Sequence, residues 1–168
     1  MVLVAIGGLS IASLYAEPTI WNGPLITFSK PALADCTLAE NQDRITDLVW
    51  ITRASTQGLF NIETELSYVH NLSPAGTEWA YGTTADYASL TYTNWESWAK
   101  PPPQTVGKDA VLHLKDEDIY IDIKFTSWGG SGGEFSYVRS TVPEPASTAL
   151  LTTGACFVLL RPRRDHPR

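Results

Sequence analysis

The chain has 168 residues, with 18 acidic and 12 basic side chains and a formal net charge of −6 at pH 7. Because Arg161, Arg163, Arg164 and Arg168 lie near the C-terminus, the rest of the chain is more acidic still. Such a surface repels nucleic acid and anionic membranes, so we expect no nucleic-acid partner. Only Cys36 lies in the body of the chain, which predicts a fold without an internal disulfide that depends on its hydrophobic core.

The first segment of the chain, residues 1–16, is apolar and carries no charged side chain. This composition is typical of the hydrophobic part of a secretory signal, with cleavage after Ala16. The basic residues that usually precede such a run are missing, and Leu14 is larger than the residue usually found there. A buried strand is the alternative. Cleavage after Ala16 leaves a body at residues 17–141, which is long enough for one domain.

The body consists mainly of short β-prone runs separated by turn residues. Strands are expected at Thr19–Trp21, Leu25–Phe28, Leu48–Thr52, Leu59–Glu63, Glu78–Thr83, Tyr87–Tyr92, Ala110–Leu114, Asp118–Phe125 and Phe135–Arg139. The capping-box spacing of Thr37–Glu40 predicts one helical turn. The three prolines of Lys100–Pro103 predict a surface segment of polyproline II.

The clearest pattern is the alternation of apolar and polar residues over Asp118–Phe125. A period of two places Ile119, Ile121 and Ile123 on one face of a strand and the charged residues on the other. The glycine-rich loop 129–133 then connects this strand to an antiparallel partner at Phe135–Arg139.

Many short strands and almost no amphipathic helix predict an all-β fold for residues 17–141. We expect an antiparallel two-sheet sandwich with a jelly-roll-like arrangement, and a closed barrel is the alternative. The apolar run Ala146–Leu160 is expected to form a hydrophobic helix outside this domain.

Tryptophan is more frequent in the body than in ordinary domains. The six tryptophans are Trp21, Trp50, Trp79, Trp95, Trp98 and Trp128. An indole offers a flat apolar face that suits the C–H face of a sugar ring. We expect Trp95 and Trp98, beside the proline segment, to be an exposed pair, with Trp128 next, so these three are the candidate glycan-binding residues. The alternative is that the indoles fill the core.

An acidic group around the predicted strand 118–125 suggests a calcium site. Its members are Asp116, Glu117, Asp118 and Asp122. Carboxylate oxygens suit Ca²⁺, but this spacing matches no calcium-binding loop. A charged strand face that discourages pairing at a sheet edge is the preferred explanation, so no metal site is predicted.

The sequence contains no pattern that predicts a catalytic residue or a cofactor site. The histidines are isolated, and no serine lies in a nucleophile-elbow motif. Glu63, Glu65 and Glu78 leave a glycoside hydrolase as an alternative, because paired carboxylates can cleave glycosidic bonds. Because the sequence shows no catalytic motif, we expect a protein that is not an enzyme.

The C-terminal segment has three parts in a fixed order. Val142, Pro143, Glu144 and Pro145 come first, the uncharged run Ala146–Leu160 follows, and a basic cluster with Arg161, Arg163 and Arg164 comes last. At about 1.5 Å per residue, the apolar run is shorter as a helix than the roughly 30 Å hydrocarbon core of a bilayer. It suits a temporary anchor, with the arginines on the cytoplasmic side.

Residues 142–164 resemble the PEP-CTERM sorting signal of Gram-negative bacteria. The order of the Pro-Glu-Pro motif, the apolar run and the arginines carries this resemblance. It implies export, processing by an exosortase at the membrane, and release to or display on the cell surface, often beside exopolysaccharide. Two features depart from the pattern: Pro162 interrupts the basic cluster, and a tail at residues 165–168 extends beyond it.

The body is similar to uncharacterised short exported proteins that carry the same signal. The residues that carry this likeness are Asp118–Trp128, the glycine loop, Phe135–Tyr137 and Arg139–Thr141. The likeness implies no activity. We therefore expect an exported protein of the cell surface or extracellular matrix, with a structural or adhesive role. A glycan-binding module is the first alternative and a glycoside hydrolase the second.

Overall fold

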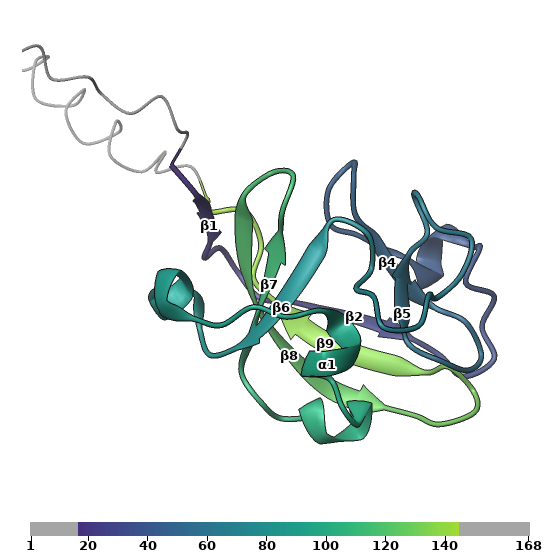
Figure 1. Cartoon of the computed structure of the whole chain (residues 1–168). Helices are drawn as coiled ribbons and strands as arrows, with labels where there is room; N and C mark the ends of the chain where they lie inside the picture. Colours follow the sequence, from purple (N-terminus) through teal and green to yellow (C-terminus); the bar gives the residue numbers. More distant parts are fainter. Residues whose placement is uncertain (1–16, 145–168) are drawn as a thin grey trace, which may run out of the picture.

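The computed structural model describes residues 17–144 (Figure 1). The predicted signal segment at residues 1–16 lies outside the described residues. So do Pro145, the run Ala146–Leu160, Arg161, Arg163 and Arg164 of the sorting signal, and the tail 165–168. Of that signal, Val142, Pro143 and Glu144 are described, and all three are exposed and free of regular structure.

The described residues form two antiparallel sheets with few helices (Figure 1). The larger sheet has six strands in the order β2-β9-β8-β7-β6, with β1 paired in parallel to the first part of β8. Its strands are β1 (Thr19–Trp21), β2 (Ile26–Lys30), β6 (Thr77–Tyr81), β7 (Ala110–Leu114), β8 (Ile119–Trp128) and β9 (Phe135–Arg139). The smaller sheet consists of β3 (Asp43–Arg44), β4 (Trp50–Arg53) and β5 (Leu59–Asn61). The prediction of a mostly β fold with two sheets is confirmed at this level.

The order of strands in the larger sheet is simpler than that of a jelly roll. From β6 to β9, strands that are consecutive along the chain are also neighbours in the sheet, and β2 adds to the end of this meander. A jelly roll is instead built from two Greek keys, with strands shared between its sheets. Short connections favour this order from β7 to β9, because they join strands that lie side by side, whereas the longer segment 82–109 joins β6 to β7.

Strand β8 confirms the alternation seen in the sequence. Ile121, Ile123 and Phe125 are 0%, 3% and 1% exposed, whereas Asp122 and Lys124 are partly exposed on the other face. However, β8 lies between β7 and β9 in the middle of the sheet. The explanation that its charges guard a sheet edge is therefore wrong.

Residues 87–92, predicted as a strand, are not one. A 3₁₀ helix, η2, occupies Thr84–Ser89 instead. The Asp122 carboxylate accepts hydrogen bonds from the backbone N–H and the hydroxyl of Thr84, both at 2.7 Å, and this fixes the start of η2. The ring of Tyr87 then packs on Tyr120, with centroids 4.7 Å apart. These contacts come from a distant strand, so local β propensity is overridden.

The proline segment also differs from its prediction. Pro102–Thr105 forms a 3₁₀ helix, η3, in which the Thr105 hydroxyl donates to Pro102 O at 2.8 Å. The N-terminal turn lies slightly later than expected, as the 3₁₀ helix η1 at Ala39–Asn41. There the Thr37 hydroxyl donates to the Asp35 carboxylate at 2.8 Å, so it does not cap the helix. A short helix that was not predicted, α1, spans Trp95–Trp98.

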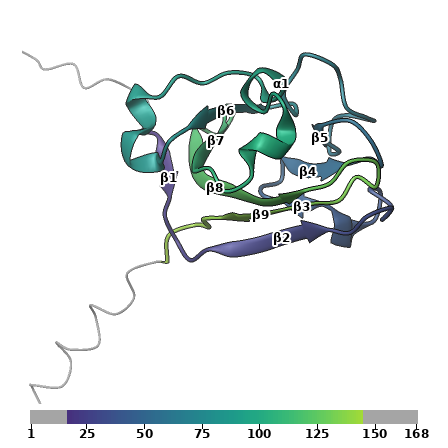
Figure 2. The same ribbon diagram turned by 90° about the horizontal axis from the view of Figure 1, so that it is seen from below.

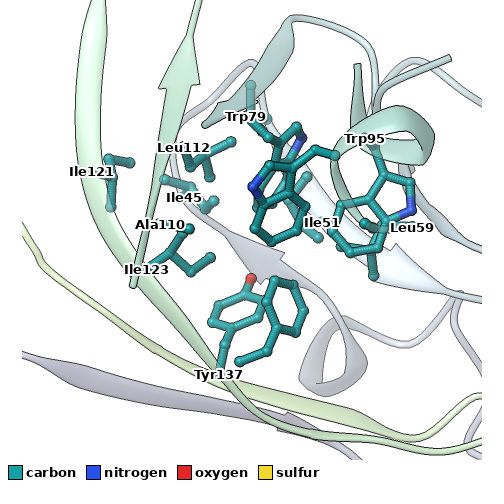
Figure 3. Close-up of a cluster of buried hydrophobic side chains, with 14 of the residues drawn as sticks. Ile45, Ile51, Leu59, Trp79, Trp95, Ala110, Leu112, Ile121, Ile123 and Tyr137 are labelled. Atoms are coloured by element: carbon teal, nitrogen blue, oxygen red, sulfur yellow. The ribbon is translucent and has the colours of Figure 1, made fainter. Parts of the chain in front are cut away.

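Both sheets contribute to a single hydrophobic core (Figure 3). Ile51 comes from the smaller sheet and Trp79, Leu112 and Tyr137 come from the larger one, and all four are 0% exposed. Helix α1 closes one side by placing Trp95 against Trp79, with ring centroids 5.0 Å apart. None of the helices between Glu17 and Glu144 has the length and hydrophobicity that a membrane crossing needs.

A buried ion pair joins the two sheets. On β9, Arg139 donates from Nε and Nη2 to the two carboxylate oxygens of Asp43 on β3, at 2.7 and 2.8 Å. The Tyr137 hydroxyl donates to the same carboxylate at 2.7 Å. The side chains of the pair are only 5% and 7% exposed. Burial, and then the Asp43 charge, raise the pKa of Tyr137 well above its ordinary value, so its hydroxyl remains a donor.

Replacement of Asp43 by alanine is expected to lower the free energy of unfolding by about 3–5 kcal/mol, because Arg139 then remains buried without a counter-charge. Urea denaturation followed by tryptophan fluorescence measures this change. Asp47→Ala is the control, because Asp47 is exposed, and it should change the stability by less than about 0.5 kcal/mol. Equal effects of the two substitutions would contradict the role of the ion pair.

Candidate functional site

One hollow on the domain collects aromatic and charged side chains. It has a volume of about 500 Å³ and lies where β4, the end of β8, helix α1 and the loop around Tyr68 meet. Tyr68, Trp95 and Trp128 supply aromatic surface, and Glu96 and Lys100 supply charge. A concave site with aromatic walls and a few polar groups is the usual form of a small-molecule pocket. We call this hollow the aromatic pocket.

The three candidate tryptophans are in different environments. Trp95 and Trp98 are 1% and 6% exposed, so the prediction that they form an exposed pair is wrong. Trp98 stacks on Trp79 with centroids 5.3 Å apart, and it does not line the aromatic pocket. Trp95 and Trp128 do line it, with ring centroids 5.5 Å apart. The structure therefore brings two of the three predicted residues to one site.

Trp128 has little free ring surface. The Arg53 guanidinium lies 4.0 Å from the centroid of this indole ring, and the rings of Trp95, Phe125 and Phe135 lie within van der Waals reach on the core side. Trp128 is therefore only partly exposed. Because Arg53 covers one face of this indole, face-to-face stacking of a sugar on Trp128 is not the expected mode of binding.

Arg53 holds the rim of the aromatic pocket. Its Nε donates to Gln57 O at 2.8 Å and its Nη1 donates to Gly129 O at 2.8 Å. Two further bonds reach Glu134 O and Gly130 O, both at 3.1 Å. Burial lowers the pKa of Arg53, but the base strength of a guanidinium keeps it charged. The cation thereby ties the glycine loop to β4.

Glu96 is the polar centre of the aromatic pocket. A single carboxylate oxygen, Oε2, accepts from the Tyr68 hydroxyl at 2.6 Å and contacts His70 Nδ1 at 2.7 Å. The backbone N–H of Asn71 donates to the same oxygen. The hydrogen bond from Tyr68 is the main reason that the pKa of Glu96 lies below its usual range. Glu96 therefore links helix α1 to the loop 68–71 as an anion.

Gly58 keeps the floor of the aromatic pocket open. A Cβ atom at this position would lie 2.6 Å from Tyr68 Cε2 and 2.8 Å from Trp95 Nε1. Both distances are too short for real carbon contacts, so any larger residue would displace one of the two rings. The backbone of the turn at 56–58 can approach the rings only because this residue has no side chain.

A second polar cluster lies on another part of the larger sheet, around His113. Its Nδ1 lies 2.8 Å from Glu78 Oε1 and its Nε2 lies 3.1 Å from Asp118 Oδ1. The ring of Tyr120 stacks on the imidazole with centroids 4.0 Å apart and an angle of 5°. No serine, threonine or cysteine of residues 17–144 is hydrogen-bonded to His113, so the cluster is not a Ser-His or Cys-His arrangement.

The carboxylates considered for glycoside cleavage have separate roles. Glu78 pairs with His113, and Glu65 accepts from the backbone N–H groups of Asn61 and Ala75 at 2.7 and 3.0 Å. Glu63 is exposed. These contacts engage Glu65 and Glu78 in the packing of different loops and strands, which gives the hydrolase alternative no support.

The acidic group considered for Ca²⁺ is likewise divided among several partners. Asp122 binds Thr84, Asp118 binds His113, and Glu117 accepts from the Thr46 hydroxyl at 2.8 Å. In the part of the chain from Glu17 to Glu144, no group of three or more His, Cys, Asp or Glu side chains is arranged to hold a metal ion. Cys36 in this range is a free, partly buried thiol.

Sequence reasoning missed Tyr68, His70, Glu96 and Gly58 as pocket residues. Tyr68 and His70 lie in a loop without any motif, and they meet Glu96 from across 25 or more intervening positions. The turn at Thr56-Gln57-Gly58 was recognisable, but its contact with Trp95 was not.

The chain matches no protein-family model, no curated protein and no solved structure.

The aromatic pocket makes a prediction about tyrosine ionisation. Burial, and then the hydrogen bond to Glu96 and its charge, raise the pKa of Tyr68 to about 12. Glu96→Gln should lower this pKa without returning it to the ordinary value of about 10, because burial remains. A pH titration of the tyrosine ring carbons by NMR measures the change.

The raised pKa of Tyr68 also makes the free energy of unfolding depend on pH. Protonated Tyr68 stabilises the fold fully below about pH 10, and this contribution is lost as the pH rises through about 12. Glu63→Gln is the matched control, since Glu63 is an exposed glutamate in the same β5–β6 connection as Tyr68. An unchanged Tyr68 titration in Glu96→Gln would contradict the assigned contact.

Proposed function

We propose that this chain is an exported protein of the cell surface or extracellular matrix, sorted by residues 142–164 and processed by an exosortase. Its role is structural or adhesive, without catalysis. The observation that carries the proposal is the order of Val142–Pro145, the apolar run Ala146–Leu160 and the arginines after it. In that order, the prolines keep the segment separate from the last strand, and the run enters the membrane as a helix outside the domain.

The proposed structural role agrees with the way the domain is stabilised. Most of the tryptophan side chains pack in the core, since Trp21, Trp79, Trp95 and Trp98 are all buried. Buried cations, Arg53 and Arg139, tie loops and sheets together where a secreted domain often uses disulfides. Val142, Pro143 and Glu144 follow the end of β9 after two intervening residues and are exposed, which supports the proposal that a membrane enzyme reaches this part of the motif.

Removal of the C-terminal segment tests the sorting proposal. A chain that ends at Thr141 is expected to lose surface display and processing, because it lacks both the apolar run and the arginines. Cell fractionation and immunoblotting of the full and shortened chains measure the distribution of each. Identical surface display of the two chains would rule out a role of this segment in sorting.

Glycan binding at the aromatic pocket is the second candidate function. The observation in its favour is the meeting of the partly exposed rings of Tyr68 and Trp128 with Glu96 and Lys100 at one hollow. Aromatic surface binds the C–H groups of a sugar, and charged side chains bind its hydroxyl groups. The exopolysaccharide beside which such proteins are displayed is the expected ligand class.

A glycan-array screen tests this second candidate. Binding of an oligosaccharide by the wild type should weaken about tenfold to a hundredfold in Glu96→Gln, because a charged hydrogen-bond acceptor is lost. Glu63→Gln should bind as the wild type does, since Glu63 is exposed and does not line the pocket. Absence of binding to every polysaccharide tested, or equal affinity of the two variants, would eliminate the pocket as a glycan site.

A further inference from the structure

Strand β2 forms one edge of the larger sheet, beside β9 (Figure 2). The opposite edge is closed at its centre, where Trp79 on β6 exchanges two backbone hydrogen bonds with Thr93, both at 2.9 Å. No such bridge lies along the outer side of β2 within residues 17–144. Apart from the three-residue strand β1, which pairs only with β8, the sheet therefore has an open edge at β2 and a bridged edge at β6.

The register of the strands shows which backbone groups of β2 lack a partner. Because Ser140 N–H donates to Asp122 O at 2.9 Å, the backbone of Ser140 and of every second residue before it faces β8. The residues between them face β2, and one of these, Tyr137, lies opposite Phe28. Phe28 therefore bonds to β9, and the N–H and C=O groups of its two neighbours point away from the sheet.

These neighbours are Thr27 and Ser29, and both are exposed. Proteins commonly guard such an edge with charged side chains, a bulge or a covering loop. The residues from Leu25 to Ser29 carry no charge, and their pairing with β9 is regular. Leu25 and Ile26 are 67% and 40% exposed. The edge is thus uncharged, partly apolar and ready to accept another strand.

We infer that a second copy of this chain pairs with β2 in antiparallel orientation and joins two larger sheets across a twofold axis. With the axis at Phe28, Thr27 of one copy lies opposite Ser29 of the other, and they exchange both backbone hydrogen bonds. Leu25 then lies opposite Pro31, whose carbonyl accepts the Leu25 N–H. Pro31 has no N–H of its own that would need a partner. The strand is therefore complementary to itself.

Charge and topology favour a second copy over other occupants. The chain has a net charge of −6, so copies repel one another elsewhere, but β2 carries no charge at its outward positions. Because pairing uses the same strand in both copies and β6 is closed at Trp79, the assembly ends at two. This inference rests on the proposed structural role, because pairing increases the avidity of an adhesive protein.

Sedimentation of the purified full chain tests the inference. Thr27→Pro removes an outward N–H that makes no bond to β9, and proline is tolerated at such edge positions, so the fold is retained. Loss of a ladder bond from each copy should raise the dimer dissociation constant about tenfold or more. Thr27→Val, which keeps the N–H and the β-branched shape, should associate as the wild type does. Association through the chain ends is the same in all three proteins and does not depend on position 27.

Hydrogen exchange of the wild type provides a measurement that needs no variant. Exchange of the Thr27 and Ser29 amides should slow as the protein concentration rises, whereas the Phe28 amide, bonded to β9, should be protected throughout. Fast exchange of both amides at all concentrations would overturn the inference, and so would a dimer that Thr27→Pro leaves intact. Protection independent of concentration would assign the partner to the same chain and also overturn it. Because these readouts are made in solution, they are independent of surface sorting.

Discussion

The buried contact between Arg139 and Asp43 is the constraint on which the two-sheet arrangement depends. A guanidinium on β9 and a carboxylate on β3 meet in bidentate geometry, and the Tyr137 hydroxyl completes the set. In a low-dielectric interior an unpaired charge is costly, so the observed packing of the two sheets, which pairs the charges, is favoured over one that separates them. The shared core of Figure 3, with Ile51 on one side and Tyr137 on the other, forms around this register.

Arg53, two residues beyond the strand partner of Asp43 in β4, applies the same principle. Its guanidinium donates to four backbone carbonyls, two of them in the glycine loop, and covers a face of Trp128. The loop gains a fixed position from this contact, and the aromatic pocket gains a rim. Buried, hydrogen-bonded cations thus perform the cross-linking that disulfides perform in many exported domains, which agrees with a body whose described cysteine, Cys36, is free.

The two surfaces proposed here for interactions differ in chemistry. The aromatic pocket is concave and charged, with Glu96 at its centre, and it suits a small polar ligand. The edge of β2 is extended and uncharged, and its unpaired backbone suits another strand. The pocket lies near the end of β8 and helix α1, and one strand, β9, separates β8 from β2 in the sheet order.

The sequence alone predicted the β class, most strand positions and the face that each residue of β8 presents, because a period of two is a local property of the chain. It also placed Trp95 and Trp128 among the candidate site residues. Tertiary contacts decided the rest. The Asp122 carboxylate binds the backbone N–H of Thr84 and so stabilises a 3₁₀ helix where the sequence predicted a strand. The ring of Trp79 stacks on Trp98 and helps to bury it. The pairing of Glu96 with Tyr68 and the open edge of β2 likewise depend on which distant segments of the chain meet. Local sequence propensities contain no information about such contacts.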